Sequence, residues 1–172
     1  MKVIFLDVDG VLNCVRTKEQ TPSGCTGIES KLVKNLATIV DETKATIILT
    51  SDWKIEWEAV SFCCSEDAKY LNAKLEEEGL RIVGKTYDDH VYDPYLRDRG
   101  KGIRRYLDAL EDSAEGYVIL DDHIFEDYDS ELRKHLVKTN SFEGLTTKDA
   151  ERAIEILNGN LMEDSYYEQR YY

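Results

Sequence analysis

The stretch that decides the fold reads VIFL at residues 3–6 and continues directly into DVDGV at residues 7–11. A short, wholly apolar run of this kind is typical of a strand buried on both faces of a parallel sheet. It ends in two carboxylates one residue apart, and a glycine that allows a sharp turn follows. In open α/β sheets, ligands bind just beyond the carboxyl ends of the strands. Because two acids there are costly to desolvate alone, they indicate a bound hard divalent cation.

Four more apolar runs follow the first one, Lys2–Leu6, and segments of helical periodicity separate them. The runs are Thr46–Leu49, Arg81–Val83, Tyr117–Leu120 and Leu136–Val137. The helical segments are Ile28–Thr43, Ala68–Glu78, Gly102–Leu110 and Thr147–Leu157, the last with Thr147 as its cap and no capping box. This alternation predicts an α/β fold, namely a doubly wound (Rossmann-like) parallel sheet of about five strands with helices on both faces.

The length of 172 residues suits one domain, which we expect at residues 1–160. Residues 161–172 form an acidic, tyrosine-rich tail, which we expect to be either a frayed end or a segment that docks on the domain or on a second subunit. A homodimer is therefore one of the expected possibilities. No separate cap domain fits between the motifs described below. Two long polar loops, residues 16–27 and 86–100, are expected near the site.

Composition limits the class of protein. The net charge is −13, from 35 acidic and 22 basic residues, and it repels nucleic-acid backbones and anionic membranes at long range. A basic strip runs against this trend, either as a solvated helix face or as part of the site: Arg97, Arg99, Lys101, Arg104 and Arg105. No transmembrane segment or signal peptide is visible, and the four cysteines lack CxxC spacing, so we expect a cytoplasmic protein with reduced thiols.

Polar residues of complementary type follow three of the expected strands. Asp7 and Asp9 follow the first, residues 50–53 (TSDW) the second, and residues 121–122 (DD) the fourth, while Lys101 opens a helix before the fourth. In a parallel sheet these ends meet at one edge. Together they offer carboxylates, two hydroxyls with free backbone amides and one ammonium, which is the set that a phosphoryl group needs. The alternatives are turn acids, helix N-capping by the hydroxyls and a surface lysine.

The order of these motifs resembles the haloacid dehalogenase-like (HAD) hydrolase superfamily. DVDG, a strand ending in TS, a helix-opening lysine and a strand ending in DD occur in that order over residues 1 to about 125. More narrowly, FLDVDGVLN, LTSDWK and the late FEGLT resemble the small HAD domains related to the Swiss Army Knife RNA repair proteins.

The resemblance implies a role for each matching residue. Asp7 would be the nucleophile that forms an aspartyl-phosphate. Asp9 would protonate the leaving oxygen and then activate water, and its main-chain carbonyl would touch the metal. Thr50, assisted by Ser51, would hold the phosphate, and Lys101 would neutralise charge between the nucleophile and the phosphoryl oxygens.

The remaining site residues follow from the same resemblance. Asp121 and Asp122 would complete a Mg²⁺ site with Asp7 and Asp9, and Asp122 is favoured as the direct ligand. Asn13 and Trp53 would line the mouth of the site and contact substrate, although Trp53 could instead pack against the sheet edge.

These residues predict a magnesium-dependent phosphatase that acts on a phosphorylated small molecule or nucleic-acid end. An acid at position 9 favours a phosphatase over the ion pumps of the superfamily, which carry threonine there. The alternatives are a receiver-like phospho-acceptor domain and a catalytically idle phosphate-binding module. A receiver would carry its acceptor after the third strand, where this chain has GKT at residues 84–86.

Overall fold

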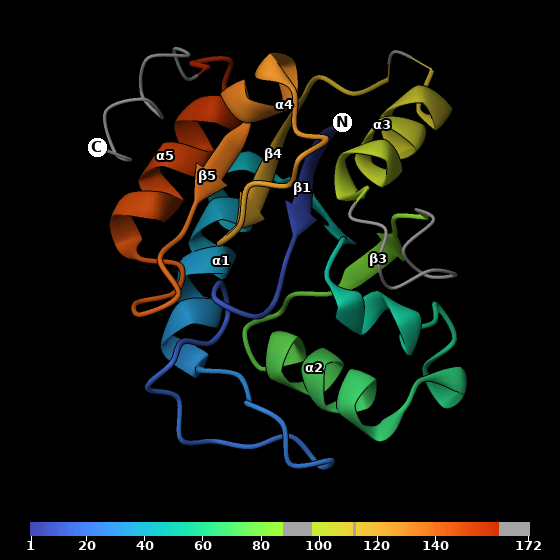
Figure 1. The fold of residues 1–172 in the computed structure, drawn as a ribbon, viewed down its shortest axis with the longest axis vertical. Helices are drawn as coiled ribbons and strands as arrows, with labels where there is room; N and C mark the ends of the chain where they lie inside the picture. Colours follow the sequence, from blue (N-terminus) through green and yellow to red (C-terminus); the bar gives the residue numbers. More distant parts are fainter. Residues whose placement is uncertain (88–97, 112, 162–172) are drawn as a thin grey trace.

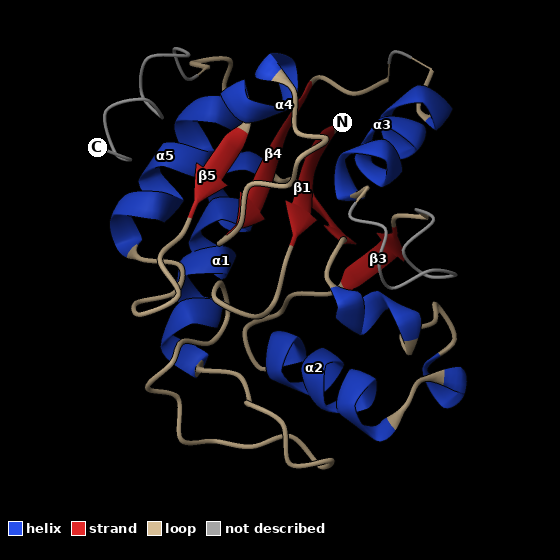
Figure 2. Cartoon of the chain, in the orientation of Figure 1, coloured by secondary structure: helices blue, strands red, loops and turns tan. Residues whose placement is uncertain are grey.

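The structure is a computed structural model that describes residues 1–87, 98–111 and 113–161. Its centre is a parallel sheet of five strands in the order β3-β2-β1-β4-β5 (Figure 2). The strands are β1 (Lys2–Leu6), β2 (Thr46–Leu49), β3 (Ile82–Lys85), β4 (Gly116–Asp121) and β5 (Leu136–Lys138). The predicted doubly wound sheet is confirmed, with β1 and β2 at the expected bounds.

The register of the central strands aligns three of the predicted site residues. Leu6 of β1 pairs with Leu49 of β2 on one side and with Leu120 of β4 on the other. The next residue of each strand is therefore Asp7, Thr50 or Asp121. Parallel pairing alone brings these three positions to the same edge of the sheet.

Helices cover both faces of this sheet. They are α1 (Ser30–Thr43), α2 (Glu66–Glu76), α3 (Arg99–Ala109), α4 (Ser130–Lys134) and α5 (Thr147–Leu157), with two 3₁₀ turns, η1 (Asp52–Ile55) and η2 (Ser61–Cys63). Helices α1 and α5 pack against each other on one face (Figure 1). Helix α3 packs on the opposite face, where Tyr106 meets the ring of Phe5 edge-on at 5.7 Å between centroids. Figure 1 shows α2 beyond the tip of the β1 arrow, close to the carboxyl edge of the sheet.

The core forms around β1, whose apolar residues Val3 to Leu6 are all fully buried. Burying one such side chain stabilises the fold by about 1.5–3 kcal/mol relative to leaving it exposed. A strand covered on both faces cannot alternate apolar and polar residues, which explains its unbroken apolar run. The tightly packed strand therefore presents Asp7 from a rigid base.

Two boundaries differ from the prediction in ways that matter. Helix α3 begins at Arg99, three residues before the segment Gly102–Leu110 in which the helical periodicity is visible, because glycines at 100 and 102 add no side chain to that pattern. The cap of α5 is Thr146, not Thr147, and it forms a capping box with Asp149, so the expected absence of a box was wrong. Helix α4 and the 3₁₀ turns are too short to produce a periodic signal.

Some predictions fall on residues outside the described part of the chain. These are Arg97, most of the loop 86–100, and the tail 161–172 apart from Leu161. Within the described residues, every strand belongs to the one sheet, the helices and the two short turns surround it, and no separate cap domain is present. No helix in this part of the chain has the length and apolarity needed to cross a membrane.

Candidate active site

Three carboxylates gather where β1 and β4 end, and we call Asp7, Asp121 and Asp122 the acidic cluster. Each offers an oxygen, and these oxygens lie within 4.8 Å of one another. Asp7 is 5% exposed and Asp121 is fully buried, whereas Asp122 is half-buried. Such a set of hard oxygen ligands suits a divalent cation such as Mg²⁺.

The guanidinium of Arg99, at the start of α3, lies against this cluster. Its Nη1 donates to Asp7 Oδ1 at 2.7 Å and to Asp121 Oδ2 at 3.0 Å. Its Nη2 donates to Asp52 Oδ1 at 3.2 Å. The ring of Phe125 lies 4.3 Å from the guanidinium carbon and covers it on one side. Arg99 is thus a buried cation that joins Asp7, which follows β1, to Asp121 at the end of β4.

Burial shapes the pKa values of the cluster. Desolvation, reinforced by the charge of Asp121, raises the pKa of Asp7 to about 8 although Arg99 works against the shift. Burial likewise raises the pKa of Asp121, and burial together with Asp121 raises that of Asp122. Arg99 bonds to Asp7 and Asp121 but not to Asp122, so three ionised carboxylates would carry more charge than this guanidinium can balance. The donor set therefore fits a divalent cation, which would supply that missing charge.

The side chain of Asp122 lies so close to the backbone of residue 10 that only glycine fits at this position. Its φ is +78°, in the left-handed region, and a Cβ at this position would overlap the carboxyl group of Asp122. The Gly10 carbonyl also accepts a hydrogen bond of 2.7 Å from Thr139 Oγ1. The glycine of DVDG therefore serves two purposes, the turn after β1 and room for the third acid.

Thr50 and Ser51 differ from each other in their surroundings. Thr50 Oγ1 is buried and has no hydrogen-bond partner among the described residues. The backbone amides of both residues donate to the Leu6 carbonyl, at 2.9 and 3.3 Å, so the prediction that these amides are free was wrong. Ser51 is the residue before η1, but its side chain makes no capping bond. A buried, unpaired hydroxyl is costly, and the Thr50 hydroxyl therefore marks the position of a missing acceptor.

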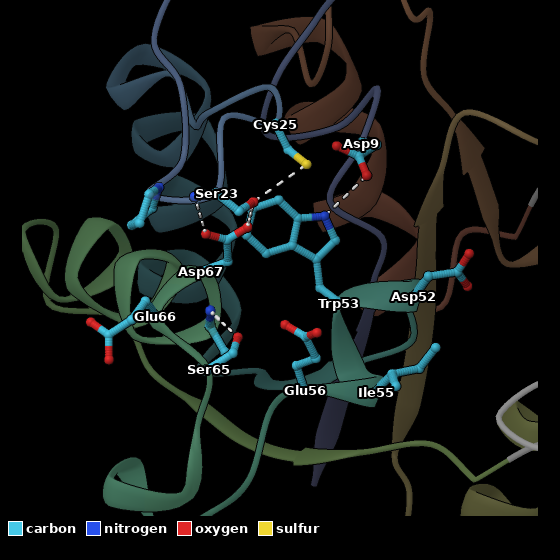
Figure 3. Close-up of a pocket in the computed structure, with 12 residues that line it drawn as sticks. Asp9, Ser23, Cys25, Asp52, Trp53, Ile55, Glu56, Ser65, Glu66 and Asp67 are labelled. Atoms are coloured by element: carbon cyan, nitrogen blue, oxygen red, sulfur yellow. Dashed lines mark hydrogen bonds between the residues drawn. The ribbon is translucent and has the colours of Figure 1, made fainter.

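The carboxylate of Asp9 is not part of the acidic cluster. β1 ends at Leu6 and the chain then turns, so the alternation of an extended strand does not carry Asp9 to the side of Asp7. The exposed Asp9 carboxylate accepts hydrogen bonds from Asn13 Nδ2 at 2.8 Å and from Trp53 Nε1 at 3.0 Å (Figure 3). Asn13, only 3% exposed, also accepts from the Gly10 amide at 2.9 Å. Asn13 and Trp53 were predicted to contact substrate, and here both hold Asp9.

Lys101 and Arg99 occupy opposite sides of the first turn of α3. Two residues are about 200° apart around a helix, so both cannot face the sheet edge. Arg99 is buried against Asp7, whereas Lys101 Nζ lies 3.8 Å from Asp98 Oδ2 and its side chain is 49% exposed. Sequence reasoning treated Arg99 only as part of a basic strip. Two features of the sequence could have identified Arg99 as the cation that faces Asp7. It lies two residues before Lys101, and the helix begins at residue 99.

A pocket of about 700 Å³ opens beside Asp9. Its walls come from the loop after β1, from η1 and from the start of α2 (Figure 3). The lining residues are Asp9, Pro22, Ser23, Cys25, Asp52, Trp53, Ile55, Glu56, Ser65, Glu66, Asp67 and Ala68. The volume is within the range of small-molecule sites, and Asp9 connects the pocket to the carboxyl edge of the sheet.

Comparison with known proteins identifies this arrangement. No curated protein and no solved structure matches the chain. A family model does match residues 3–150, which include the acidic cluster, Thr50, Arg99 and the pocket. That model describes the HAD domain in Swiss Army Knife RNA repair proteins, and the chain belongs to this family.

Proposed function

We propose that the protein is a magnesium-dependent phosphomonoesterase that works through an aspartyl-phosphate on Asp7. Membership of the HAD family indicates a phosphohydrolase. The observation that carries the finer proposal is the alignment of Asp7, Thr50 and Asp121 by strand register, with Arg99 bound to both acids. These observations support the proposal because the reaction needs a nucleophile, a hydroxyl donor and a cation close together, and Asp7, Thr50 and Arg99 are of these types.

The reaction has two displacements. In the first, a carboxylate oxygen of Asp7 forms a bond to phosphorus and the bond from phosphorus to the ester oxygen breaks. Asp9 gives its proton to that oxygen, so the leaving group departs as a neutral alcohol or phenol. In the second, Asp9 takes a proton from water, the water oxygen bonds to phosphorus, and the bond to Asp7 breaks. Asn13 and Trp53 keep the Asp9 carboxyl group beside the pocket through their hydrogen bonds.

Thr50 and Arg99 stabilise the phosphoryl group in this scheme. The Thr50 hydroxyl, which has no acceptor among the described residues, would donate to a phosphoryl oxygen. Arg99 would balance the charge that develops on the oxygens near Asp7. Lys101 was expected in that role, and we propose Arg99 for it because its guanidinium already contacts the nucleophile.

Asp7, Asp121 and Asp122 would hold Mg²⁺, together with the main-chain carbonyl of Asp9. The bound ion would supply positive charge for the phosphoryl oxygens. The acidic cluster supports this assignment because its oxygens converge and its pKa values are raised by burial and mutual repulsion.

The test is release of inorganic phosphate from 4-methylphenyl phosphate with Mg²⁺ present and after its removal by a chelator. We expect turnover that requires Mg²⁺ and falls by at least about 10³-fold in Asp7→Asn, since the nucleophile is lost. Asp41→Asn, an exposed aspartate of α1, is the matched control and should keep full activity. Full turnover by Asp7→Asn would refute the proposal.

A further inference from the structure

The pocket beside Asp9 has a charge pattern unlike that of a polynucleotide site. Among the described residues that line it, five carry carboxylates and none is Lys or Arg. They are Asp9, Asp52, Glu56, Glu66 and Asp67. Asp52 is paired with Arg99, and Glu66 with Lys69 at 2.7 Å, but neither cation lines the pocket. The pocket therefore carries an excess of negative charge.

Asp67 keeps its charge at neutral pH. Burial would raise its pKa, but hydrogen bonds from Ser23 and Thr21 outweigh that effect and lower the pKa. These bonds also join the loop after β1 to the start of α2, since Ser23 and Thr21 both donate to Asp67 Oδ2 (Figure 3 shows the Ser23 bond). The hydrogen bonds from Thr21 and Ser23 therefore hold the Asp67 carboxylate in place on the wall of the pocket.

Trp53 gives the pocket a flat apolar surface. Its indole lies between Asp9 and the acidic residues of the wall, with its ring nitrogen bonded to Asp9 (Figure 3). Pro22, Ile55 and Ala68 add apolar area to the lining. An indole next to carboxylates suits a planar ligand, and the carboxylates attract a cationic one.

We propose that this pocket receives the leaving group of the substrate and selects a flat group that bears no negative charge, with a cationic group preferred over a neutral one. The inference rests on the proposed phosphatase activity and adds the class of substrate. It follows because Asp9, the proposed proton donor to the leaving oxygen, is also a wall of the pocket. The substrate is thus a small phosphomonoester of an aromatic or cationic alcohol, not a phosphorylated nucleic-acid end.

A nucleic-acid end fits the same surface poorly. Proteins gain affinity for nucleic-acid phosphates by neutralising them with Lys or Arg, and the described residues that line the pocket include neither. The described arginines of the basic strip beyond Arg99 lie on α3 and bond elsewhere, Arg104 to Asp129 and Arg105 to the Tyr87 carbonyl. An added phosphate in the pocket would therefore meet carboxylates.

The test uses three aryl monophosphates with the same phenolic leaving oxygen and different para substituents. These are 4-(2-aminoethyl)phenyl phosphate, 4-methylphenyl phosphate and 3-(4-phosphonooxyphenyl)propionate, which carry an ammonium, no charge and a carboxylate. We expect kcat/KM to fall in that order, by at least about tenfold between the first and the last. A 5′-phosphorylated trinucleotide should be hydrolysed no faster than the propionate.

Substitutions of pocket residues test whether the pocket causes the preference for the ammonium probe. In Glu56→Gln/Glu66→Gln, the ratio of kcat/KM between ammonium and carboxylate probes should shrink by about threefold or more, because two carboxylates of the pocket lose their charge. Glu76→Gln, at the far end of α2 and outside the pocket, is the control and should keep the ratio.

The possible results distinguish a failure of the proposed leaving-group selectivity from a failure of the proposed phosphatase activity. Hydrolysis with equal rates for the three probes, or with preference for the carboxylate or the trinucleotide, would overturn the inference and leave the phosphatase standing. An unchanged ratio in the double variant would also overturn it. Absence of hydrolysis with all probes, together with absence of an aspartyl-phosphate, would overturn the phosphatase itself.

Discussion

The acidic cluster and the pocket lie on either side of the turn after β1, and both are rich in carboxylates. In the cluster, Asp7 and Asp121 are buried and bound to one guanidinium. In the pocket, Asp9, Glu56 and Glu66 are exposed, and the lining residues that the structure describes include no Lys or Arg. Carboxylates thus occur in two environments, the low-dielectric interior in the acidic cluster and the solvent-exposed surface in the pocket.

The difference separates two tasks. A buried charge is expensive unless paired, so the cluster is confined to one geometry and recognises what every substrate shares, the phosphoryl group. Exposed carboxylates are screened by water and salt, so each contributes little and together they bias which leaving group enters. Substitutions in the cluster should therefore change the reaction with every substrate, whereas substitutions in the pocket should change preference among substrates.

After the loss of the proposed nucleophile in Asp7→Asn, the largest effect on turnover is expected from replacing Arg99. Arg99→Lys keeps a positive charge but loses the bonds that join Asp7 and Asp121, and we expect kcat/KM to fall by about 10²-fold for all three aryl phosphates. Lys101→Gln, two residues away on the exposed side of α3, should lose less than about threefold. Steady-state kinetics of both variants measures this. The reverse ranking would return the role to Lys101.

A smaller effect is expected from Thr50→Val, which removes the hydroxyl and keeps the shape. Because Thr50 Oγ1 has no partner among the described residues, the free energy of unfolding should stay the same or rise by about 1 kcal/mol. The kcat/KM for aryl phosphates should fall by about 10- to 100-fold, since the phosphoryl group loses a donor. Denaturant unfolding and kinetics on the same preparation test both parts. A destabilised variant with normal kinetics would show a structural role instead.

Trp53→Phe should link the two regions. The phenyl ring keeps the apolar wall but cannot donate to Asp9, so we expect a loss of about threefold to tenfold in kcat. The ratio between ammonium and carboxylate probes should remain, because the carboxylates of the wall are unchanged. The measurement is the pH profile of kcat for each probe. A change in probe preference with no change in kcat would limit Trp53 to substrate contact.

The smallest effect concerns stability without metal. The pKa of Asp7 is raised from 3.8 to about 8 in the folded protein, so above about pH 4 the unfolded state binds fewer protons than the folded state. The contribution of Asp7 to stability is therefore complete below about pH 4 and is lost as pH rises through about 8.

Thermal melts at several pH values test this sign. In chelator, we expect the melting temperature to fall by at least about 2–4 °C between mildly acidic and mildly alkaline buffer, and millimolar Mg²⁺ should reverse the fall. Asp7→Asn should flatten the dependence. A melting temperature in chelator that rises over this range, and does so equally in Asp7→Asn, would contradict the raised pKa.

Some features of the fold and of the candidate site could be predicted from local sequence patterns, whereas others depend on tertiary packing. The sheet and the alignment of Asp7, Thr50 and Asp121 were predictable, because a buried parallel strand has a strong apolar signal and parallel ends meet at one edge. The contact of Arg99 with Asp7 was not, because it depends on where α3 begins, and boundaries shift with tertiary packing. The separation of Asp9 from Asp7 depends on the turn at Gly10, whose path follows from the position of Asp122.

The pocket could not be predicted from the sequence either. Its walls come from three segments that are distant in the chain, and hydrogen bonds such as Ser23 to Asp67 bring two of them together. Trp53 was predicted at the mouth of the site, but its bond to Asp9 requires the path of η1.

The most direct test of the central claim is to trap the phosphoenzyme. Acid quenching during turnover of 4-methylphenyl phosphate with Mg²⁺, followed by borohydride reduction and peptide mass spectrometry, converts an aspartyl-phosphate into homoserine at its position. We predict homoserine at residue 7 and none in Asp7→Asn. Steady turnover with the label at another aspartate, or with none at residue 7, would contradict the account.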